Sequence, residues 1–130
     1  MENDNVKFKN EFKKRLYNWV LRLIKFIDKL HKDSVCMVMG NQLLRSGTSI
    51  LANYIEASFS SSKRDFINFF TYALKSANES KVWLCLLRDI GKGEKNRIRM
   101  VVERTDRNSQ YFSFKHFNSK GQEIENDFTF

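Results

Sequence analysis

The sequence contains no proline, and it lacks any long uninterrupted apolar run. Proline breaks helix interiors because it has no amide donor and clashes with the preceding turn, so its absence favours long continuous helices. No apolar run approaches the ~18 residues that a membrane-spanning helix requires. Residues 1–5 are polar and acidic, unlike the start of a signal peptide. We therefore expect a cytoplasmic protein with no membrane partner.

Cysteine and histidine are scarce, and their spacing excludes several kinds of chemistry. Cys36 and Cys85 are too few for a disulfide framework, and we expect both thiols to be reduced and buried. Neither His31 nor His116 has a cluster of cysteines or carboxylates around it at helical spacing, so the sequence predicts no metal site. There is also no glycine-rich phosphate loop, and nothing links a serine to a base. We expect no cofactor, no catalytic residue and no enzymatic activity.

Residues 4–32 have the apolar periodicity of an amphipathic helix. The apolar positions step by threes and fours: Phe8, Phe12, Leu16, Trp19 or Val20, Leu23, Phe26 or Ile27, and Leu30. Most of the basic residues fall off this stripe: Lys9, Lys13, Lys14, Arg22, Lys25 and Lys29. We expect the stripe to pack against the following helices, and the alternative is a helix lying on a membrane surface. Asp33 or Ser34 is expected to cap the next helix.

Residues 39–57 form the stretch around which the rest of the chain is organised. Its apolar residues recur at helical spacing: Leu43, Ile50, Tyr54 and Ala57. Glycine in a helix interior costs about 1 kcal/mol relative to alanine, so Gly47 needs a structural reason. We expect Gly47 and Ala52 to lie at close helix contacts. Several polar side chains would then be partly buried and need hydrogen-bond partners: Asn41, Gln42, Ser46, Ser49 and Asn53. The alternative is that Arg45 and the amides face a ligand.

A third helix is predicted to begin after Ser62 and to end at Gly91 and Gly93. Ser62 followed by Asp65 resembles a capping box, and the short connection 59–62 favours antiparallel neighbours. Its apolar stripe contains Phe66, Phe70, Ala73, Ala77, Leu84 and Leu87. We interpret the aromatic residues as core side chains, not as a platform for stacking nucleobases.

The net charge of +8 is concentrated on the first and third helices. Residues 1–32 contain nine Lys/Arg against four Asp/Glu, and residues 59–95 contain seven against four. A basic helical surface suggests RNA or DNA as a partner, and a solvated lysine-rich surface is the alternative. Lys63 and Arg64 fall in the first turn of a helix, where outward-pointing amides can also bind phosphate. The candidate phosphate contacts are Arg15, Arg22, Lys25, Arg45, Lys63 and Arg64.

Two blocks of the sequence carry a family resemblance. The first is the stretch 39–57, and the second begins Ser62-Lys63-Arg64-Asp65-Phe66 and continues to Leu84. Together they resemble the bacterial four-helix-bundle family named for proteins encoded in 23S rRNA intervening sequences, which includes the accessory protein of diversity-generating retroelements. Leu51 stands where that family usually has glycine. The resemblance implies an all-α, up-down antiparallel four-helix bundle that forms homo-oligomers, pentamers among them. It also implies a nucleic-acid-binding role or, as the alternative, a protein partner such as a reverse transcriptase.

Beyond Lys95 the helical pattern weakens, and the resemblance is expected to stop there. Polar residues interrupt positions 104–110, and positions 111–117 alternate like a strand. We therefore predict a bundle domain over residues 1–103, with a short or disrupted fourth helix, and an irregular tail over residues 104–130. The shortened helix would leave an apolar groove exposed, lined by Leu23, Ile50 and Leu84.

One hypothesis for this tail is a change of coding frame near Lys95 or Asn96. Codons permitted by the sequence, read one nucleotide later, can encode an amphipathic peptide of helical period. The alternative is a genuine divergent tail with a role of its own.

Overall fold

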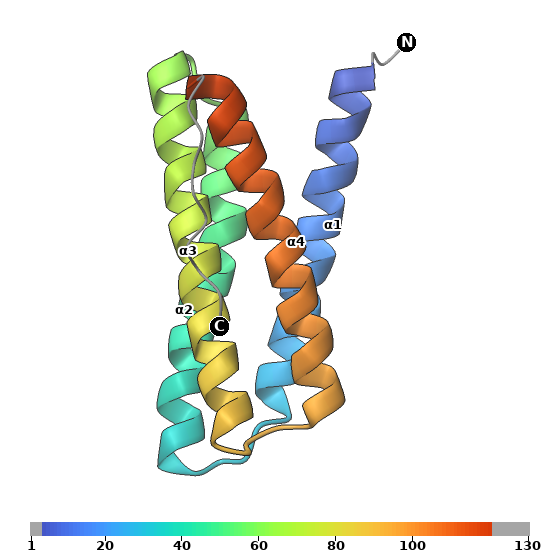
Figure 1. The fold of residues 1–130 in the computed structure, drawn as a ribbon, viewed down its shortest axis with the longest axis vertical. Coiled ribbons are helices and arrows are strands. Elements are labelled where there is room, and N and C mark those ends of the chain that lie inside the picture. The colour runs from blue at the N-terminus through green and yellow to red at the C-terminus, as the bar shows by residue number, and fades with distance from the viewer. Residues whose placement is uncertain (1–3, 121–130) are drawn as a thin grey trace.

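Four long helices run alternately up and down the molecule (Figure 1). The computed structural model describes residues 4–120: α1 spans Asp4–Asp28, α2 Ser34–Ser58, α3 Lys63–Asp89 and α4 Lys95–Lys120. The predicted all-α, up-down four-helix bundle is confirmed. Among the described helices, none combines the length and the apolar character needed to cross a bilayer.

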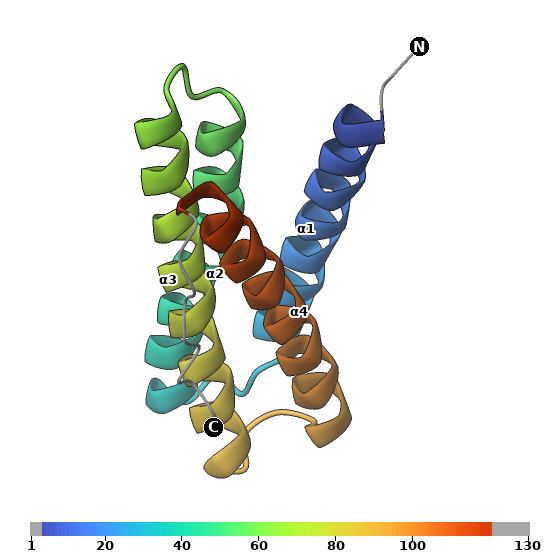
Figure 2. The ribbon, with the colours of Figure 1, turned by 45° about the horizontal axis from the view of Figure 1, so that its top comes forward.

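The helices are arranged as a close pair, α2 and α3, against which α1 and α4 pack. The α1–α2 and α3–α4 loops lie together at one end of the bundle, and the α2–α3 loop lies at the other (Figure 1). In both views α4 crosses α1 obliquely and leans toward α3 at its C-terminal end (Figures 1 and 2).

One apolar core joins the four helices. Its fully enclosed members include Leu16, Leu23, Leu43, Ile50, Leu84, Leu87 and Ile98. The apolar stripe of α1 is therefore buried in the bundle, as expected, and is not available to lie on a membrane surface. The prediction that Leu23, Ile50 and Leu84 line an exposed groove is wrong, because each is fully buried in a cluster that α4 completes.

The fourth helix is longer than predicted, running as far as Lys120 and well past residue 103. Its inward positions, Ile98, Val101, Thr105 and Asn108, are all buried and follow helical spacing. The Thr105 hydroxyl donates to the Val101 carbonyl at 2.7 Å, so a polar side chain occupies the interior with its hydrogen bond satisfied.

Because these residues form a helical face in the frame given, the boundary at 103 is wrong. The frame-change hypothesis assumed that the helical pattern of the bundle ends near Lys95. The pattern of buried residues instead continues to Asn108, so that premise is wrong. Residues 121–130 of the predicted tail lie outside the described residues.

Gly47 allows α1 to approach α2 closely, as predicted. A Cβ atom at Gly47 would lie 2.1 Å from Leu23 Cδ2 and 3.5 Å from Trp19 Cη2, and the first distance is far inside van der Waals contact. Both neighbours are buried, so neither can move aside without disturbing the core. Ala52 does not share this role: it is exposed, and the prediction that it lies at a helix contact is wrong.

The polar side chains of α2 find local partners. Ser46 and Ser80 are fully buried where α2 meets α3, with their hydroxyl oxygens 2.8 Å apart. The Asn53 amide donates to the Ser49 carbonyl at 2.8 Å, and the Ser49 hydroxyl donates to the Arg45 carbonyl at 2.8 Å. Asn41 was expected to be partly buried and is exposed instead.

The helix caps fall where the sequence placed them. Asp33 accepts a hydrogen bond from the Cys36 amide at 2.9 Å, and Ser62 accepts one from the Asp65 amide at 3.1 Å. The chain leaves α3 through Gly91, whose φ of 75° is a conformation that glycine adopts at little cost. The Asp33 carboxylate also forms an ion pair with the Lys92 ammonium at 3.1 Å. This one carboxylate therefore connects the α1–α2 and α3–α4 loops. The Cys36 hydrogen bond and Lys92 together lower the pKa of Asp33 to about 2.

Replacing Gly47 with leucine should lower the free energy of unfolding by about 1–3 kcal/mol, because the new side chain overpacks the contact with Leu23. Urea denaturation of the purified variant measures the change. Ala52→Leu is the matched control, since it adds the same atoms to an exposed position of the same helix and should leave stability nearly unchanged. Equal stability of the two variants would show that Gly47 is not a close contact.

The Asp33 contacts predict an acid-dependent loss of stability. A carboxyl whose pKa falls from 3.8 in the unfolded chain to about 2 in the folded chain stabilises the fold fully above the higher value. That contribution is lost as the pH falls through about 2. Asp33→Asn keeps a capping oxygen but does not titrate, so the difference in stability between parent and variant should shrink on acidification. Thermal melts of both proteins between pH 7 and the acid range would show it, and a constant difference would contradict it.

Candidate nucleic-acid interface

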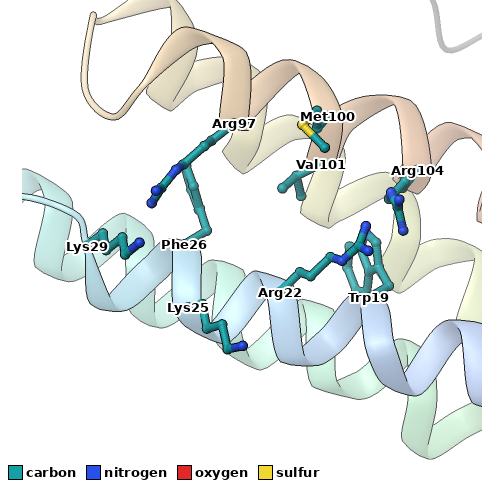
Figure 3. Close-up of a pocket in the computed structure, with 9 residues that line it drawn as sticks. All are labelled: Trp19, Arg22, Lys25, Phe26, Lys29, Arg97, Met100, Val101 and Arg104. Carbon is teal, nitrogen blue, oxygen red and sulfur yellow. The ribbon is translucent and has the colours of Figure 1, made fainter.

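Two adjoining hollows lie between α1 and α4, one after the other along the two helices. The first, which we call the apolar hollow, is shown in Figure 3 and has a volume of about 210 Å³. It is lined by Trp19, Arg22, Lys25, Phe26, Lys29, Arg97, Met100, Val101 and Arg104. The second, the arginine hollow, is lined by Arg15, Trp19, Arg104, Arg107 and Asn108. Trp19 and Arg104 belong to both, so the two hollows form one continuous cleft.

The spacing of residues along α1 explains why cations and aromatic rings alternate in this cleft. Residues four and three apart share a helix face, and the side chains on the face toward α4 follow that spacing. They are Arg15, Trp19, Arg22, Phe26 and Lys29. The apolar members fill the space between the helices, and the long basic side chains reach past them with charged ends at the rim.

The facing side of α4 repeats the same alternation. Arg97, Arg104 and Arg107 are separated by Met100 and Val101, and all five line the cleft. Met100 is 52% exposed, so it presents an apolar surface to whatever enters. In Figure 3 the side chains of Arg22, Trp19 and Arg104 point toward one another across the gap between α1 and α4.

The charges in the cleft are of one sign. Neither hollow has an aspartate or glutamate in its lining. At the rim, Arg97 pairs with Glu94 at 3.0 Å. The pKa of Arg104 is lowered, first by burial and then by the positive charges of Arg22, Arg107 and Arg15. A guanidinium stays protonated despite such a shift, so the repulsion persists and the cleft attracts anions.

Trp19 lies at the centre of the cleft and is 2% exposed. Its Nε1 atom is buried and has no hydrogen-bond acceptor among the described residues. Next to it, the guanidinium of Arg15 lies 5.0 Å from the ring centre of Phe12, which holds that cation against α1. Most buried side-chain donors in proteins have a partner, so an unpaired one beside a cationic cleft is a feature that a ligand can satisfy.

The predicted phosphate contacts separate into two groups. Arg15, Arg22 and Lys25 line the cleft, although Lys25 points away from α4 in Figure 3. Arg45 lies elsewhere, on the α2–α3 side, where its guanidinium contacts the Glu79 carboxylate and the Gln42 side chain.

Lys63 and Arg64 are exposed in the first turn of α3, at the opposite end of the bundle from the α1–α2 loop, and line neither hollow. Their role as phosphate contacts stays a prediction, separate from the cleft.

The sequence reasoning missed Lys29, Arg97, Arg104 and Arg107. The first was assigned to a solvent face, and the three arginines fell on a segment not expected to continue as a helix. The available signal was the spacing of Arg97, Arg104 and Arg107, with Met100 and Val101 between them. That spacing is informative only once α4 is known to be a long helix.

The described residues offer little for bond-making chemistry. They contain no group of three potential metal ligands. Cys36 and Cys85 are free and buried, and burial raises the pKa of the Cys36 thiol, so that thiol is protonated and unreactive at neutral pH. The arrangement in the cleft can hold an anion by charge and hydrogen bonding. The absence of enzymatic activity stays a prediction.

Known proteins resemble this chain in sequence and in fold. The family model described as 23S rRNA-intervening sequence protein matches residues 9–113. A similar solved structure is a protein of unknown function from the S23 ribosomal protein family of Bacteroides thetaiotaomicron. It is 30% identical with a TM-score of 0.77, over 83% of this chain and 96% of that one. No curated protein matches the chain. Because the family match extends to residue 113, the expectation that the resemblance stops near Lys95 is wrong.

The repulsion around Arg104 predicts a gain in stability when its charge is removed. Arg104→Gln relieves a partly buried cation of three like-charged neighbours, so the melting temperature should rise at low ionic strength. The gain should shrink as salt screens the repulsion. Arg99→Gln, an exposed position of the same helix outside the cleft, is the control and should change little. A lower melting temperature for Arg104→Gln alone would show that its contacts stabilise the fold.

Proposed function

The chain belongs to the 23S rRNA-intervening sequence protein family, and from that premise we propose that it binds RNA or DNA through the phosphate backbone. The proposed binding surface is the cleft between α1 and α4, and the proposed role is that of a non-catalytic accessory protein.

One observation carries this proposal. Seven cations from two helices line a single cleft that has no carboxylate in its lining: Arg15, Arg22, Lys25, Lys29, Arg97, Arg104 and Arg107. Cations on the surface of a soluble protein are often paired with carboxylates, as Arg45 of α2 is here with Glu79 of α3. Like charges held together lower stability, so their persistence in one cleft is explained by a polyanionic partner.

The kind of contact suggests tolerance of sequence. The seven cations are arginines and lysines on two helices, and the contacts of such side chains with phosphates carry no sequence information. Binding of this kind releases condensed counterions, so its affinity falls steeply with salt. We therefore propose an affinity that depends more on the phosphate backbone than on base sequence.

Assembly of the protein with itself is a second part of the proposal. Three exposed apolar side chains, Tyr17, Leu21 and Ile24, form a stripe on a face of α1 that does not line the cleft. Met37 and Leu44 on α2 are exposed as well. Exposed apolar stripes of this kind commonly mark contacts between proteins. They support a homo-oligomer, expected to be a pentamer from the family resemblance. They equally suit the alternative function, a module that binds a protein such as a reverse transcriptase.

Two double variants with the same loss of charge test the cleft. Arg22→Gln with Arg104→Gln should weaken binding to RNA and DNA on the order of tenfold or more and reduce the salt slope by roughly 1.4–1.8, two phosphate contacts' worth. Lys63→Gln with Arg64→Gln is the matched control, and a smaller loss is expected. Fluorescence anisotropy over a series of salt concentrations measures both quantities.

Two other outcomes would contradict the cleft as the binding site or the proposed function itself. A larger loss from the Lys63 and Arg64 pair would move the site to the start of α3. No binding by the parent protein at low salt would contradict the proposal and favour the protein partner.

A further inference from the structure

The two hollows of the cleft differ in chemistry, and the difference matches the two parts of a nucleotide. The apolar hollow has an uncharged floor of Trp19, Phe26, Met100 and Val101 beneath a cationic rim. Next to it, the arginine hollow brings together Arg15, Arg104 and Arg107 with the Asn108 amide. A nucleobase is a flat group with apolar faces and polar edges, and a phosphate is a compact anion. The first hollow suits the base and the second suits the phosphate.

The volume of the apolar hollow and the side chains at its rim suit a flat aromatic ring such as a nucleobase. Its volume of about 210 Å³ is far above the ~10–15 Å³ that a single water needs. Arg22 and Arg104 stand on either side of Trp19 in Figure 3, and guanidinium planes stack on nucleobases as aromatic rings do. The exposed Met100 supplies apolar contact from the α4 side.

The buried Nε1 atom of Trp19 supplies an independent observation. It is a buried donor without a partner among the described residues, on the side chain that lines both hollows, whereas the equally unpaired Nε1 of Trp83 belongs to a residue that lines neither. Nucleobase carbonyl and ring-nitrogen atoms, and phosphate oxygens, are all acceptors for such a donor. A nucleotide spanning both hollows would therefore satisfy a hydrogen bond that the protein alone leaves unmade.

We propose that the cleft holds one unpaired nucleotide, with its base in the apolar hollow and its phosphate in the arginine hollow. The proposal rests on the proposed function and narrows it to single-stranded nucleic acid. In a duplex the base faces are stacked within the helix and only the backbone is presented, so no base can reach the floor of the apolar hollow. The cleft consequently selects loops, bulges or single strands of RNA or DNA.

Three probes test this, of which the single strand and the abasic strand carry equal numbers of phosphates and the duplex carries about twice as many. They are a single strand of about twelve nucleotides, the same strand in a duplex, and an abasic strand of the same length, each as RNA and as DNA where chemistry allows. The parent protein should bind the single strand on the order of tenfold more tightly than the abasic strand. The duplex should also bind more weakly than the single strand.

Variants of cleft residues test whether the preference for the single strand over the abasic strand arises in the cleft. Met100→Ala should reduce the ratio between single-strand and abasic affinity, while Met37→Ala, which removes a similarly exposed methionine from α2, should leave it unchanged. Arg104→Gln should weaken binding to all three probes. In a Trp83→Phe background Trp19 is the one tryptophan left, and its fluorescence should respond to the single strand more than to the abasic strand.

Two results would overturn the inference, and they are distinguishable. Equal affinity for the three probes, with no effect of Met100→Ala, would show backbone binding without a base site and would leave the proposed function intact. Failure of the parent protein to bind any probe at low salt would contradict both the proposed function and this inference.

Discussion

The close approach of Leu23 to Gly47 is the contact on which the arrangement of the bundle depends. No side chain larger than hydrogen fits between them, so α1 lies against α2 at this point and in this rotation. Trp19, four residues before Leu23, shares its inward face, and Arg22 lies beside this face among the residues that line the cleft with α4. A Cβ atom at Gly47 would also lie 3.5 Å from Trp19, so the packing of α1 on α2 and the shape of the cleft share one determinant. A glycine that lowers the intrinsic stability of α2 thus determines which face of α1 is presented to α4.

The cations of the cleft lower the stability of the fold, whereas the proposed function depends on them. Arg104 is partly removed from water beside three other cations, and no carboxylate in the lining offsets the repulsion. The bundle tolerates this because its cohesion comes from an apolar core that extends through all four helices. Energy stored as repulsion in the free protein is released when an anion arrives. Under the proposed function, the same charges that weaken the isolated fold contribute to affinity.

The fold was predictable from sequence because it depends on local periodicity, glycine and caps. The stripe of α1, the role of Gly47 and the capping side chains Asp33 and Ser62 all followed from spacing along one helix. The length of α4 was not predictable in this way, because polar residues 104–110 hid a helix whose buried face needs only Thr105 and Asn108 there. Half of the candidate contacts, Arg15, Arg22 and Lys25, line the cleft. The arginines of α4 were missed because the segment after Lys95 was not expected to continue as a helix, so their spacing did not define a helix face.

The ion pair between Asp33 and Lys92 connects α1 and α4 at one end of the cleft. It joins the two loops from which α2 and α4 begin, so the loop ends of α1 and α4 are held together. A rigid helix that turns about one end acts as a lever, and the displacement of each residue grows with its distance from that end. Arg97 lies two residues into α4 and Arg107 twelve residues into it, so a small rotation moves the second guanidinium several times farther than the first. A rotation of α4 about this end would therefore change the width of the arginine hollow more than that of the apolar hollow, which lies nearer the ion pair.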